Sequence, residues 1–541
     1  MMRIPHSVQI IGVLVWLFSC APQNESTQML DPDELPVRWP NAVTYEIFVQ
    51  SFADSNGDGI GDIKGMTLKL DYLQDLGIEN IWLMPINPSP SYHKYDVTDY
   101  YGIHPSYGTM DDFKEFLQEA HKRDIRVTMD LVINHCSNQH QWFQDALDPS
   151  NEYRDYFVWK TMEEIEAEGI LEKEKTGDSD NIKQWNKLPG QKELYFSFFY
   201  SGMPDLNYDN PKVREGVYKI GEYWLQEIGV DGFRMDAAKH IYPDNRAEDN
   251  HAFWQEFKST MQAIKPDVYI VGEVWSDLEV QTPFAQGFDA LFNFDMSFSM
   301  LETVKNKRVV SAAIHESAWK INEGSSPTEL YNESESAFKS YNPNFINTTF
   351  LTNHDQNRVM SFLNDNEEQA KLAASILLTL PGSPYIYYGE ELGMRGMKPD
   401  PLIREPYLWD KEESDTIRTS WIKAVYNTDS TLVPLAQQIE DPTSMYHHYR
   451  KLIRLRRASE VLTYGDLMTA DVNDEEILAF TRSFEGEKYL IIHNLSESEK
   501  VLPIIEFSTI IYQNTTTSVF NNNQILLPPY KSLILSQPKN Q

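Results

Sequence analysis

Short apolar runs alternate with amphipathic segments through most of the chain. Segment 111–123 is typical of the amphipathic kind, and Asp111 is its expected N-cap. Four of its apolar residues fall on one helical face: Phe113, Phe116, Leu117 and Ala120. Apolar runs with the length of buried strands occur at 43–49, 80–84, 125–133, 230–235, 268–274, 288–294, 348–352 and 384–388. Eight strands that alternate with helices predict an α/β fold, the (β/α)8 TIM barrel.

Two regions interrupt this alternation. Residues 136–205 are rich in Trp, Asp, Glu and Lys, which indicates a lobe (domain B) inserted after the third strand. The helical signal stops after about Leu455, and short apolar runs with turns between them follow at 477–482, 488–494, 501–505 and 526–535. We therefore expect the barrel to be formed by 41–135 and 206–455, and a C-terminal antiparallel β-domain by 456–541.

The first 20 residues are typical of an export signal. Residues 10–18 form an apolar run that is too short to span a bilayer. The following segment, which ends at Cys20, resembles a bacterial lipoprotein box, in which the cysteine is acylated. Phe18 is large for such a box, so ordinary signal cleavage is the alternative. Residues 21–40 carry four prolines and are expected to be a tether. We expect an exported protein, anchored to the bacterial outer membrane by lipid on Cys20.

Composition narrows the range of functions. The net charge of −34 argues against binding nucleic acid, because phosphate contacts need Lys and Arg. The two cysteines are Cys20 and Cys136, so a lipid on Cys20 leaves no disulfide within the chain.

Polar residues end several of the predicted strands. Asp130, Asp236, Glu273 and Asp355 lie at or just after the third, fourth, fifth and seventh strands. In a barrel of this kind the carboxyl ends of the strands meet at one mouth, where chemistry takes place. A single strand-end Asp is as often a turn cap or a structural ion pair, but four such residues in this order favour a catalytic centre.

Glycoside hydrolysis needs a carboxylate nucleophile and a carboxylic acid on either side of the scissile bond. Asp236 and Glu273 end neighbouring strands and suit the separation of roughly 5 Å in a retaining pair. Arg234 faces the same side of the strand as Asp236 and is expected to keep it ionised. Glu273, which we expect to be less directly paired, is the candidate acid. His135 and His354 are expected to be neutral donors nearby.

The segments that carry these residues resemble the signatures of one family. Segments 130–135 (DLVINH), 232–240 (GFRMDAAKH), 272–275 (GEVW) and 350–355 (FLTNHD) resemble the four signatures of the α-amylase family of glycoside hydrolases. Segments 203–207 (MPDLN) and 382–390 (GSPYIYYGE) are similar to two further motifs of this family. The resemblance implies that Asp236 is the nucleophile, Glu273 the acid/base and Asp355 the stabiliser of the transition state.

The resemblance also bears on the substrate. Lys239 and His240 resemble α-1,4-acting members, in which the lysine contacts a sugar on the leaving-group side. Tyr95 matches an aromatic residue that stacks on the sugar at the cleavage point. Met203 argues against the group that acts on α-1,6 oligosaccharides. Asp96 leaves exo action open, because a Tyr-Asp pair also occurs in exo-acting α-glucosidases. We expect a monomeric enzyme that cleaves α-1,4 bonds within starch-like glucans and maltooligosaccharides. Other starch-uptake proteins are its candidate partners.

Two calcium sites are expected. Oxygen-bearing residues recur at alternate positions from residue 54 to residue 62, with Gly59 at the sixth position, as at the start of an EF-hand loop. The expected ligands are Asp54, Asn56, Asp58, the Ile60 carbonyl and Asp62. The alternative is a metal-free turn rich in Asp and Asn. A second Ca²⁺ is implied by the resemblance, held by Asn134, the His240 carbonyl and a carboxylate of the lobe.

Other functions remain open from the sequence. The same catalytic groups could serve an exo-acting α-glucosidase, or a cyclomaltodextrinase or transglycosylase, because water or a sugar can attack the glycosyl-enzyme. A non-catalytic glucan-binding protein is the alternative from a different functional class. The presence of all three carboxylates together with Arg234 disfavours it.

Overall fold

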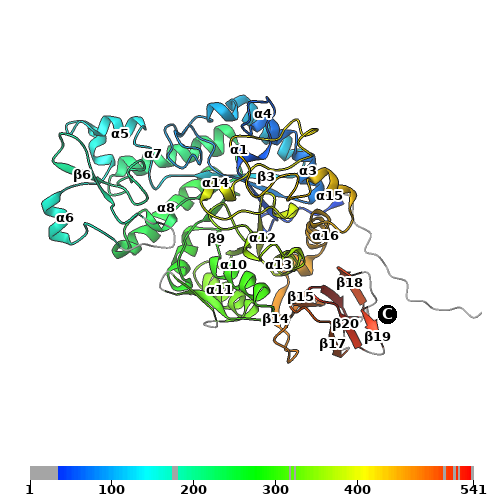
Figure 1. The fold of residues 1–541 in the computed structure, drawn as a ribbon. Coiled ribbons are helices and arrows are strands. Elements are labelled where there is room, and N and C mark those ends of the chain that lie inside the picture. Colours follow the sequence, from blue (N-terminus) through cyan, green and yellow to red (C-terminus); the bar gives the residue numbers. More distant parts are fainter. Residues whose placement is uncertain are drawn as a thin grey trace, which may run out of the picture.

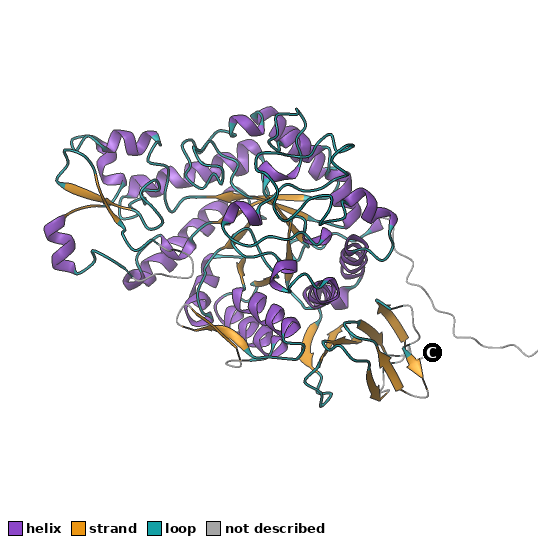
Figure 2. Cartoon of the chain, in the orientation of Figure 1, coloured by secondary structure: helices purple, strands orange, loops and turns teal. Residues whose placement is uncertain are grey.

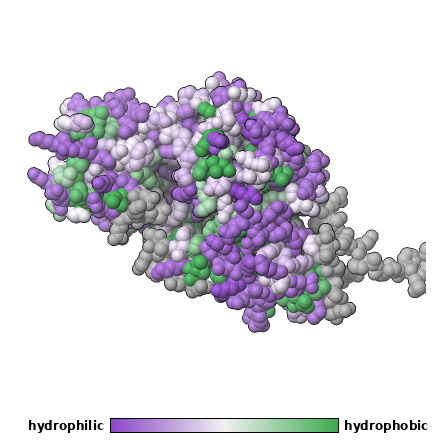
Figure 3. Space-filling model, viewed as in Figure 1, coloured by the Kyte–Doolittle hydropathy of each residue, from purple (hydrophilic) through white to green (hydrophobic). Residues whose placement is uncertain are grey.

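The structure is a computed structural model that describes residues 34–173, 179, 181–315, 318–321, 325–503, 507, 509–515, 519–521 and 524–537. The expected export signal, Cys20 and most of the expected tether lie outside the described residues. Among the described residues, no helix combines the length and apolar character needed to cross a bilayer. The face shown in Figure 3 is mainly hydrophilic with scattered hydrophobic patches, in keeping with the net charge of −34.

Eight parallel strands close into a barrel, which confirms the predicted fold class (Figures 1 and 2). Around the barrel the order is β1-β13-β12-β9-β8-β7-β3-β2. The strands are β1 (Thr44–Ile47), β2 (Asn80–Leu83), β3 (Arg126–Leu131), β7 (Gly232–Met235), β8 (Tyr269–Gly272), β9 (Ala290–Phe292), β12 (Ile346–Phe350) and β13 (Ser383–Tyr387). Nearly every residue in them is buried, because the barrel interior and the surrounding helices cover both faces.

Helices surround the barrel. The longer ones are α3 (Leu70–Leu76), α4 (Met110–His121), α7 (Pro211–Glu222), α8 (Ala247–Ile264), α10 (Phe294–Lys305), α11 (Pro327–Tyr341), α13 (Glu367–Thr379) and α16 (Met445–Ala458). The shorter ones are α1 (Val49–Phe52), α2 (Ile63–Thr67), α9 (Leu278–Gln281), α12 (Val359–Phe362), α14 (Asp400–Ile403), α15 (Leu435–Glu440) and α17 (Glu460–Tyr464). A hairpin of β10 (Ala312–His315) and β11 (Ala318–Ile321) packs against α10.

The N-terminus of α4 differs from the expected one. Thr109, not Asp111, is the N-cap, because its hydroxyl accepts the N–H of Asp112. The Asp112 carboxylate accepts the backbone N–H of Thr109 in return and completes a capping box. The helix therefore begins earlier than its apolar stripe indicates.

The barrel interior is filled by aromatic side chains. Phe292 of β9 lies 5.2 Å from Trp82 of β2 and 5.1 Å from Tyr385 of β13, measured between ring centroids. Phe350 of β12 packs on the same ring at 5.7 Å. These side chains form a rigid apolar floor below the carboxyl ends of the strands.

The chain between β3 and α7 forms a lobe beside the barrel, at the left of Figure 1. It contains α5 (Gln141–Ala146), α6 (Met162–Glu168) and a small sheet of β4 (Trp159–Thr161), β6 (Glu193–Phe196) and β5 (Trp185–Lys187). An isolated bridge from His135 to Asp205 joins the start and the end of the lobe, and a second bridge, from Phe157 to Leu206, joins its middle to its end. Cys136, at its start, is a buried free thiol.

The C-terminal part is antiparallel β-structure in two sheets. One sheet contains β14 (Asp466–Thr469), β15 (Ile477–Phe484), β16 (Glu487–Asn494), β21 (Ser532–Ser536) and β18 (Thr509–Gln513). The other contains β17 (Lys500–Pro503), β20 (Gln524–Leu527) and β19 (Phe520–Asn521).

Helical structure continues past the expected end at Leu455, through α16 and α17 to Tyr464. In the sequence, the arginines near the end of α16 resemble the polar residues that follow a helix. In the structure they belong to the helix, and Arg456 is buried. Its guanidinium donates to the carbonyl oxygens of Leu378, Leu380 and Gly382 at 3.1, 2.5 and 2.6 Å. These hydrogen bonds hold the last turn of α16 against the barrel.

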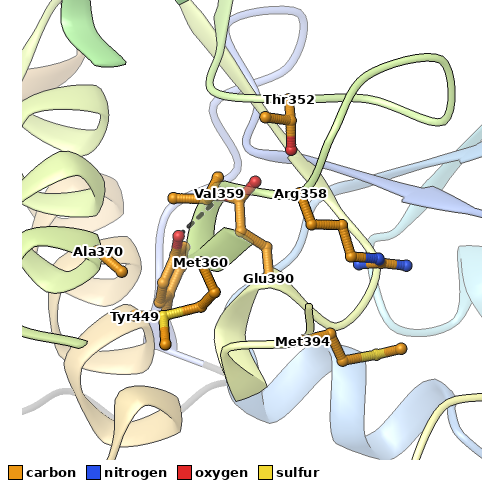
Figure 4. Close-up of a pocket in the computed structure, with 8 residues that line it drawn as sticks. All are labelled: Thr352, Arg358, Val359, Met360, Ala370, Glu390, Met394 and Tyr449. Carbon is orange, nitrogen blue, oxygen red and sulfur yellow. Dashed lines mark hydrogen bonds between the residues drawn. The ribbon is translucent and has the colours of Figure 1, made fainter. Parts of the chain in front are cut away.

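A buried carboxyl group follows β13. Figure 4 shows Glu390 pointing toward Tyr449, whose hydroxyl donates to Oε1 at 2.8 Å. The second oxygen, Oε2, is buried and accepts no hydrogen bond from a described residue. Burial, with a contribution from Glu391, raises the pKa of Glu390 from 4.5 to about 8. Glu390 is therefore held as a neutral acid at pH 7.

We expect Glu390→Gln to remove a pH-dependent part of the stability. A carboxyl whose pKa is raised on folding stabilises fully below its unfolded value of 4.5, and this contribution is lost as the pH rises through about 8. The melting temperature of the natural protein should therefore fall more steeply between pH 5 and 9 than that of Glu390→Gln, as measured by calorimetry. Glu413→Gln, at an exposed position, is the control. Identical slopes for all three proteins would contradict the assignment.

Candidate active site

Arg234 connects three carboxyl groups at the mouth of the barrel. Its Nη1 donates to Asp236 Oδ1 at 2.7 Å and to both carboxylate oxygens of Asp130 at 3.0 Å. Its Nη2 lies 2.9 Å from Glu273 Oε2. Asp130 and Arg234 are paired in the β3–β7 ladder, and Glu273 directly follows β8, so barrel closure brings these groups together.

Glu273 is paired more directly than we expected. Besides Arg234, its Oε2 accepts the backbone N–H of Ala237 at 3.2 Å. Burial nevertheless raises its pKa to about 7, and the nearby charges of Asp236 and Asp355 act in the same direction. The prediction of a raised pKa therefore agrees with the structure, but its cause is burial among other carboxylates and not the lack of a partner.

His354 and Asp355 form a second charged group after β12. The two ring nitrogens of His354 contact Glu46 Oε1 at 2.5 Å and Asp355 Oδ2 at 3.1 Å. Burial lowers the pKa of His354, but the two carboxylates outweigh burial and raise it to about 10. The expectation of a neutral His354 was therefore wrong, because it did not include Glu46 on β1. His135 does fit a neutral ring, since burial lowers its pKa.

Arg404 is a site residue that sequence reasoning missed. It is buried in the segment after β13, and its Nη2 donates to Asp355 Oδ1 at 2.9 Å. Burial raises the pKa of Asp355, but the charges of His354 and Arg404 outweigh burial and hold it well below its ordinary value. Nothing in the residues around Arg404 marks it as different from a surface arginine, so only the folded structure reveals this contact.

Tyr95 joins the two charged groups. Its hydroxyl lies 2.7 Å from His354 Nε2 and donates to Asp130 Oδ2 at 3.2 Å. The Tyr95 ring is stacked on the His354 ring, with an interplanar angle of 12°. The backbone carbonyl of Tyr95 contacts His135 Nε2 at 3.1 Å. The network therefore fixes the plane of Tyr95 beside the carboxylates.

These groups surround a cavity of about 260 Å³. Seven residues of the predicted site line it: Tyr95, His135, Asp236, Lys239, His240, Glu273 and Asp355. The residues that we did not predict are His93, Phe199, Tyr200, Met203, Ala237, Trp275, Lys398, Asp400 and Arg404. Arg234 and His354 lie behind the lining, where they contact the carboxylates.

Asp96 is outside the cavity lining. Its carboxylate accepts hydrogen bonds from Ser89 at 2.6 Å, from Ser91, and from Tyr200 at 3.2 Å. Tyr200 lines the cavity, whereas Asp96 is buried. The acceptor oxygens of Asp96 are thus already engaged by side chains of the protein.

The residues of the second expected calcium site are adjacent. Asn134 Nδ2 donates to the His240 carbonyl at 2.6 Å, and its Oδ1 contacts His135 Nδ1 at 3.0 Å. Among the described carboxylates of the lobe, Asp205 lies against Asn134 and accepts the N–H of Phe198 at 2.8 Å. Oxygen donors suitable for calcium are therefore present, although Asn134 presents its NH₂ group to the carbonyl and would have to turn its amide.

In the loop of the first expected calcium site, backbone N–H groups of the loop itself donate to the carboxylates that were expected to bind the ion. Asp54 accepts N–H groups from Asn56 and Gly57 on one oxygen and from Gly59 on the other. Asp62 accepts the N–H of Ser55 at 2.8 Å. Among the residues that the structure describes, no three His, Cys, Asp or Glu side chains group to hold a metal ion. The donor chemistry fits calcium, since Asp54 Oδ2 and Asp62 Oδ1 each accept a single hydrogen bond and keep a lone pair, but the side chains would have to move together.

Comparisons with known proteins agree with the fold and the site. The family model "Alpha amylase, catalytic domain" matches residues 46–465, and the model "Alpha-amylase SusG C-terminal domain" matches residues 477–534. Alpha-amylase 3 of Dictyoglomus thermophilum is 41% identical over 92% of this chain and 94% of that protein. A 4-alpha-glucanotransferase of Thermotoga neapolitana is 35% identical over 85% of this chain and 97% of that protein. The crystal structure of alpha-amylase from H. orenii matches with a TM-score of 0.82 and 38% identity, over 92% of this chain and 99% of that one.

The closed barrel with carboxylates at the ends of its strands defines a glycoside hydrolase of the TIM-barrel class. The matching domains are more specific, since together they span most of the chain. The chain belongs to the α-amylase family.

Proposed function

We propose that this enzyme hydrolyses α-1,4-glucosidic bonds within starch-like glucans and maltooligosaccharides, with retention of configuration. The observation that carries the proposal is the contact of one guanidinium, that of Arg234, with both Asp236 and Glu273. Two carboxyl groups on the same guanidinium must be close together, as in retaining enzymes, where the separation is roughly 5 Å. The similarity to an alpha-amylase at 41% identity supports the α-1,4 preference.

In the first step, an Asp236 oxygen attacks the anomeric carbon while the neutral carboxyl of Glu273 gives its proton to the leaving oxygen. The glycosidic C–O bond breaks and an ester to Asp236 forms. In the second step, the Glu273 carboxylate takes a proton from water, whose oxygen displaces Asp236. Arg234 stabilises the carboxylate that Asp236 regains.

Asp355 is ionised and faces the same cavity, so it is placed to accept hydrogen bonds from sugar hydroxyls as positive charge develops on the ring. Tyr95, held in plane by its hydroxyl, offers its face to the sugar ring. Lys239 and His240 line the same cavity and directly follow Ala238, whose backbone N–H donates to the Glu273 carbonyl, so they are placed to contact the leaving group. His135 lines the same cavity, and its two ring nitrogens contact Asn134 and the backbone carbonyl of Tyr95.

The position of Asp96 favours action within chains over action at chain ends. An exo-acting enzyme would use this carboxylate to hold the terminal sugar, but three protein hydroxyl groups occupy it. Transfer to a sugar in place of water is the second candidate, favoured by the similarity to a 4-alpha-glucanotransferase. We further propose that the first 20 residues direct export and that lipid on Cys20 anchors the enzyme to the outer membrane.

Products formed from amylose test the proposed function. Oligosaccharides of intermediate length should accumulate first, because cleavage falls within chains. Asp236→Asn should reduce the rate by roughly 10³-fold or more, since the nucleophile is lost, while the exposed control Asp267→Asn should not change it. Chromatography of early time points gives both results. Glucose alone from the outset would exclude action within chains, and unchanged hydrolysis by Asp236→Asn would exclude the assigned nucleophile.

The pH profile tests the acid. Glu273 must be protonated in the first step, so kcat/KM should fall as the pH rises through about 7. Glu273→Gln should lose roughly 10²- to 10⁴-fold on maltopentaose. On an aryl maltoside, whose leaving group needs no proton, the rate of the first step should fall much less in Glu273→Gln. Asp236→Asn is the matched comparison, because it should be inactive on both substrates. Equal losses of Glu273→Gln on the two substrates would contradict the role.

Calcium binding at the loop of residues 54–62 is also a proposal. Millimolar calcium should raise the melting temperature by a few degrees relative to chelator, because a ligand that binds only the folded state stabilises it. Asp58→Asn should reduce this increase. The control is Asp148→Asn in the lobe, where Asp148 also accepts a backbone N–H two residues on, from Ser150. A melting temperature that does not change with calcium would contradict calcium binding at this loop.

A further inference from the structure

Arg358 links two segments that form the active site. It lies shortly after Asp355, and 2% of its surface is exposed. Its Nε donates to the carbonyl of Ile403 at 2.8 Å, and its Nη1 donates to the carbonyl of Tyr388 at 2.7 Å. Its backbone N–H donates to the carbonyl of Gly396 at 3.0 Å. One residue is thus bound to both ends of the segment 396–403 and to the end of β13.

The surroundings of Arg358 fix its position. The guanidinium carbon lies 4.3 Å from the centre of the Tyr387 ring and 4.7 Å from that of Tyr388. Figure 4 shows its side chain extending away from Glu390 and Tyr449. The third nitrogen, Nη2, makes no hydrogen bond with any described residue, so the two carbonyl contacts determine the orientation. Burying a cation costs free energy, so a buried arginine whose side chain donates to these two carbonyls indicates that the hydrogen bonds to Ile403 and Tyr388 have a role in the structure.

The next residue after Ile403 is Arg404, which contacts Asp355 at 2.9 Å. These contacts form a closed ring. Asp355 is followed in the chain by Arg358, which donates to the carbonyl of Ile403, and the next residue, Arg404, donates to Asp355. We propose that Arg358 is a positioning residue that closes this ring of contacts and thereby sets the place of Asp355 in the cavity. This inference rests on the proposed function, in which Asp355 stabilises the transition state.

Two consequences distinguish this role from a structural one. Asp355 acts on charge that develops during the reaction, so its displacement should lower kcat more than it raises KM. Arg404 is one of the charges that hold down the pKa of Asp355, so a looser contact should move the acidic limb of the pH profile upward. General loss of stability has neither effect well below the melting temperature.

Arg456 offers a matched control. It is also fully buried, and it also donates to backbone carbonyls, but it does so before β13 begins, at the opposite end of the barrel. We compare Arg358→Lys and Arg358→Gln with Arg456→Lys. The measurements are melting temperature, kcat and KM on maltopentaose across pH, and hydrogen exchange of segment 396–404.

We expect the Arg358 variants to lose roughly 10- to 100-fold in kcat, as for displacements of about 1 Å near reacting groups, with Arg358→Lys less affected. Exchange in segment 396–404 should accelerate. Arg456→Lys should lower the melting temperature without these changes. An Arg358→Lys protein with natural kcat, acidic limb and exchange would overturn the proposal. A natural enzyme inactive on every α-glucan would instead overturn the proposed function, while the exchange data would still report whether Arg358 holds the segment.

Discussion

The contact of one buried guanidinium with three carboxyl groups is the interaction on which the active site depends. Arg234 cannot neutralise Asp130, Asp236 and Glu273 together, and water does not reach it, since it is 1% exposed. A buried excess of negative charge is relieved by binding protons. The pKa values of Asp130 and Glu273 are accordingly raised to about 7. The arrangement thus produces a neutral acid beside the proposed nucleophile.

The apolar floor of the barrel strengthens this effect. The guanidinium of Arg234 lies 5.2 Å above the Trp82 ring, which packs on Phe292. Charges interact more strongly in such surroundings than in water, and every unpaired charge costs more. The His354 ring contacts Trp82 at 5.5 Å, so both charged groups of the site rest on the same layer. Packing inside the barrel and electrostatics at its mouth are therefore coupled.

The sequence was sufficient to predict the strands and the carboxylates that end them, because both follow from local pattern and from the order of the strands. It did not reveal which side chains meet across the barrel. Glu46 lies within an ordinary apolar strand, yet after Asp355 it is the main group that raises the pKa of His354. Arg404 lies in a loop, and its contact with Asp355 depends on the path of the chain after β13. The arginines of α16 look exposed in sequence, but they find carbonyl partners only in the folded chain. Long-range pairing of polar groups was the missing information in each case.

The contrast between Glu273 and Asp355 shows how neighbours separate two similar groups. Both are carboxyl groups that line the same cavity, and burial alone would raise both pKa values. Asp355 faces two cations, His354 and Arg404, whereas Glu273 shares a single arginine with two other carboxylates. The first is therefore held ionised, whereas the second can still carry a proton near pH 7, so one accepts hydrogen bonds while the other can give a proton. Because the cations beside Asp355 come from the segments that follow β12 and β13, this division depends on how those two segments are held together.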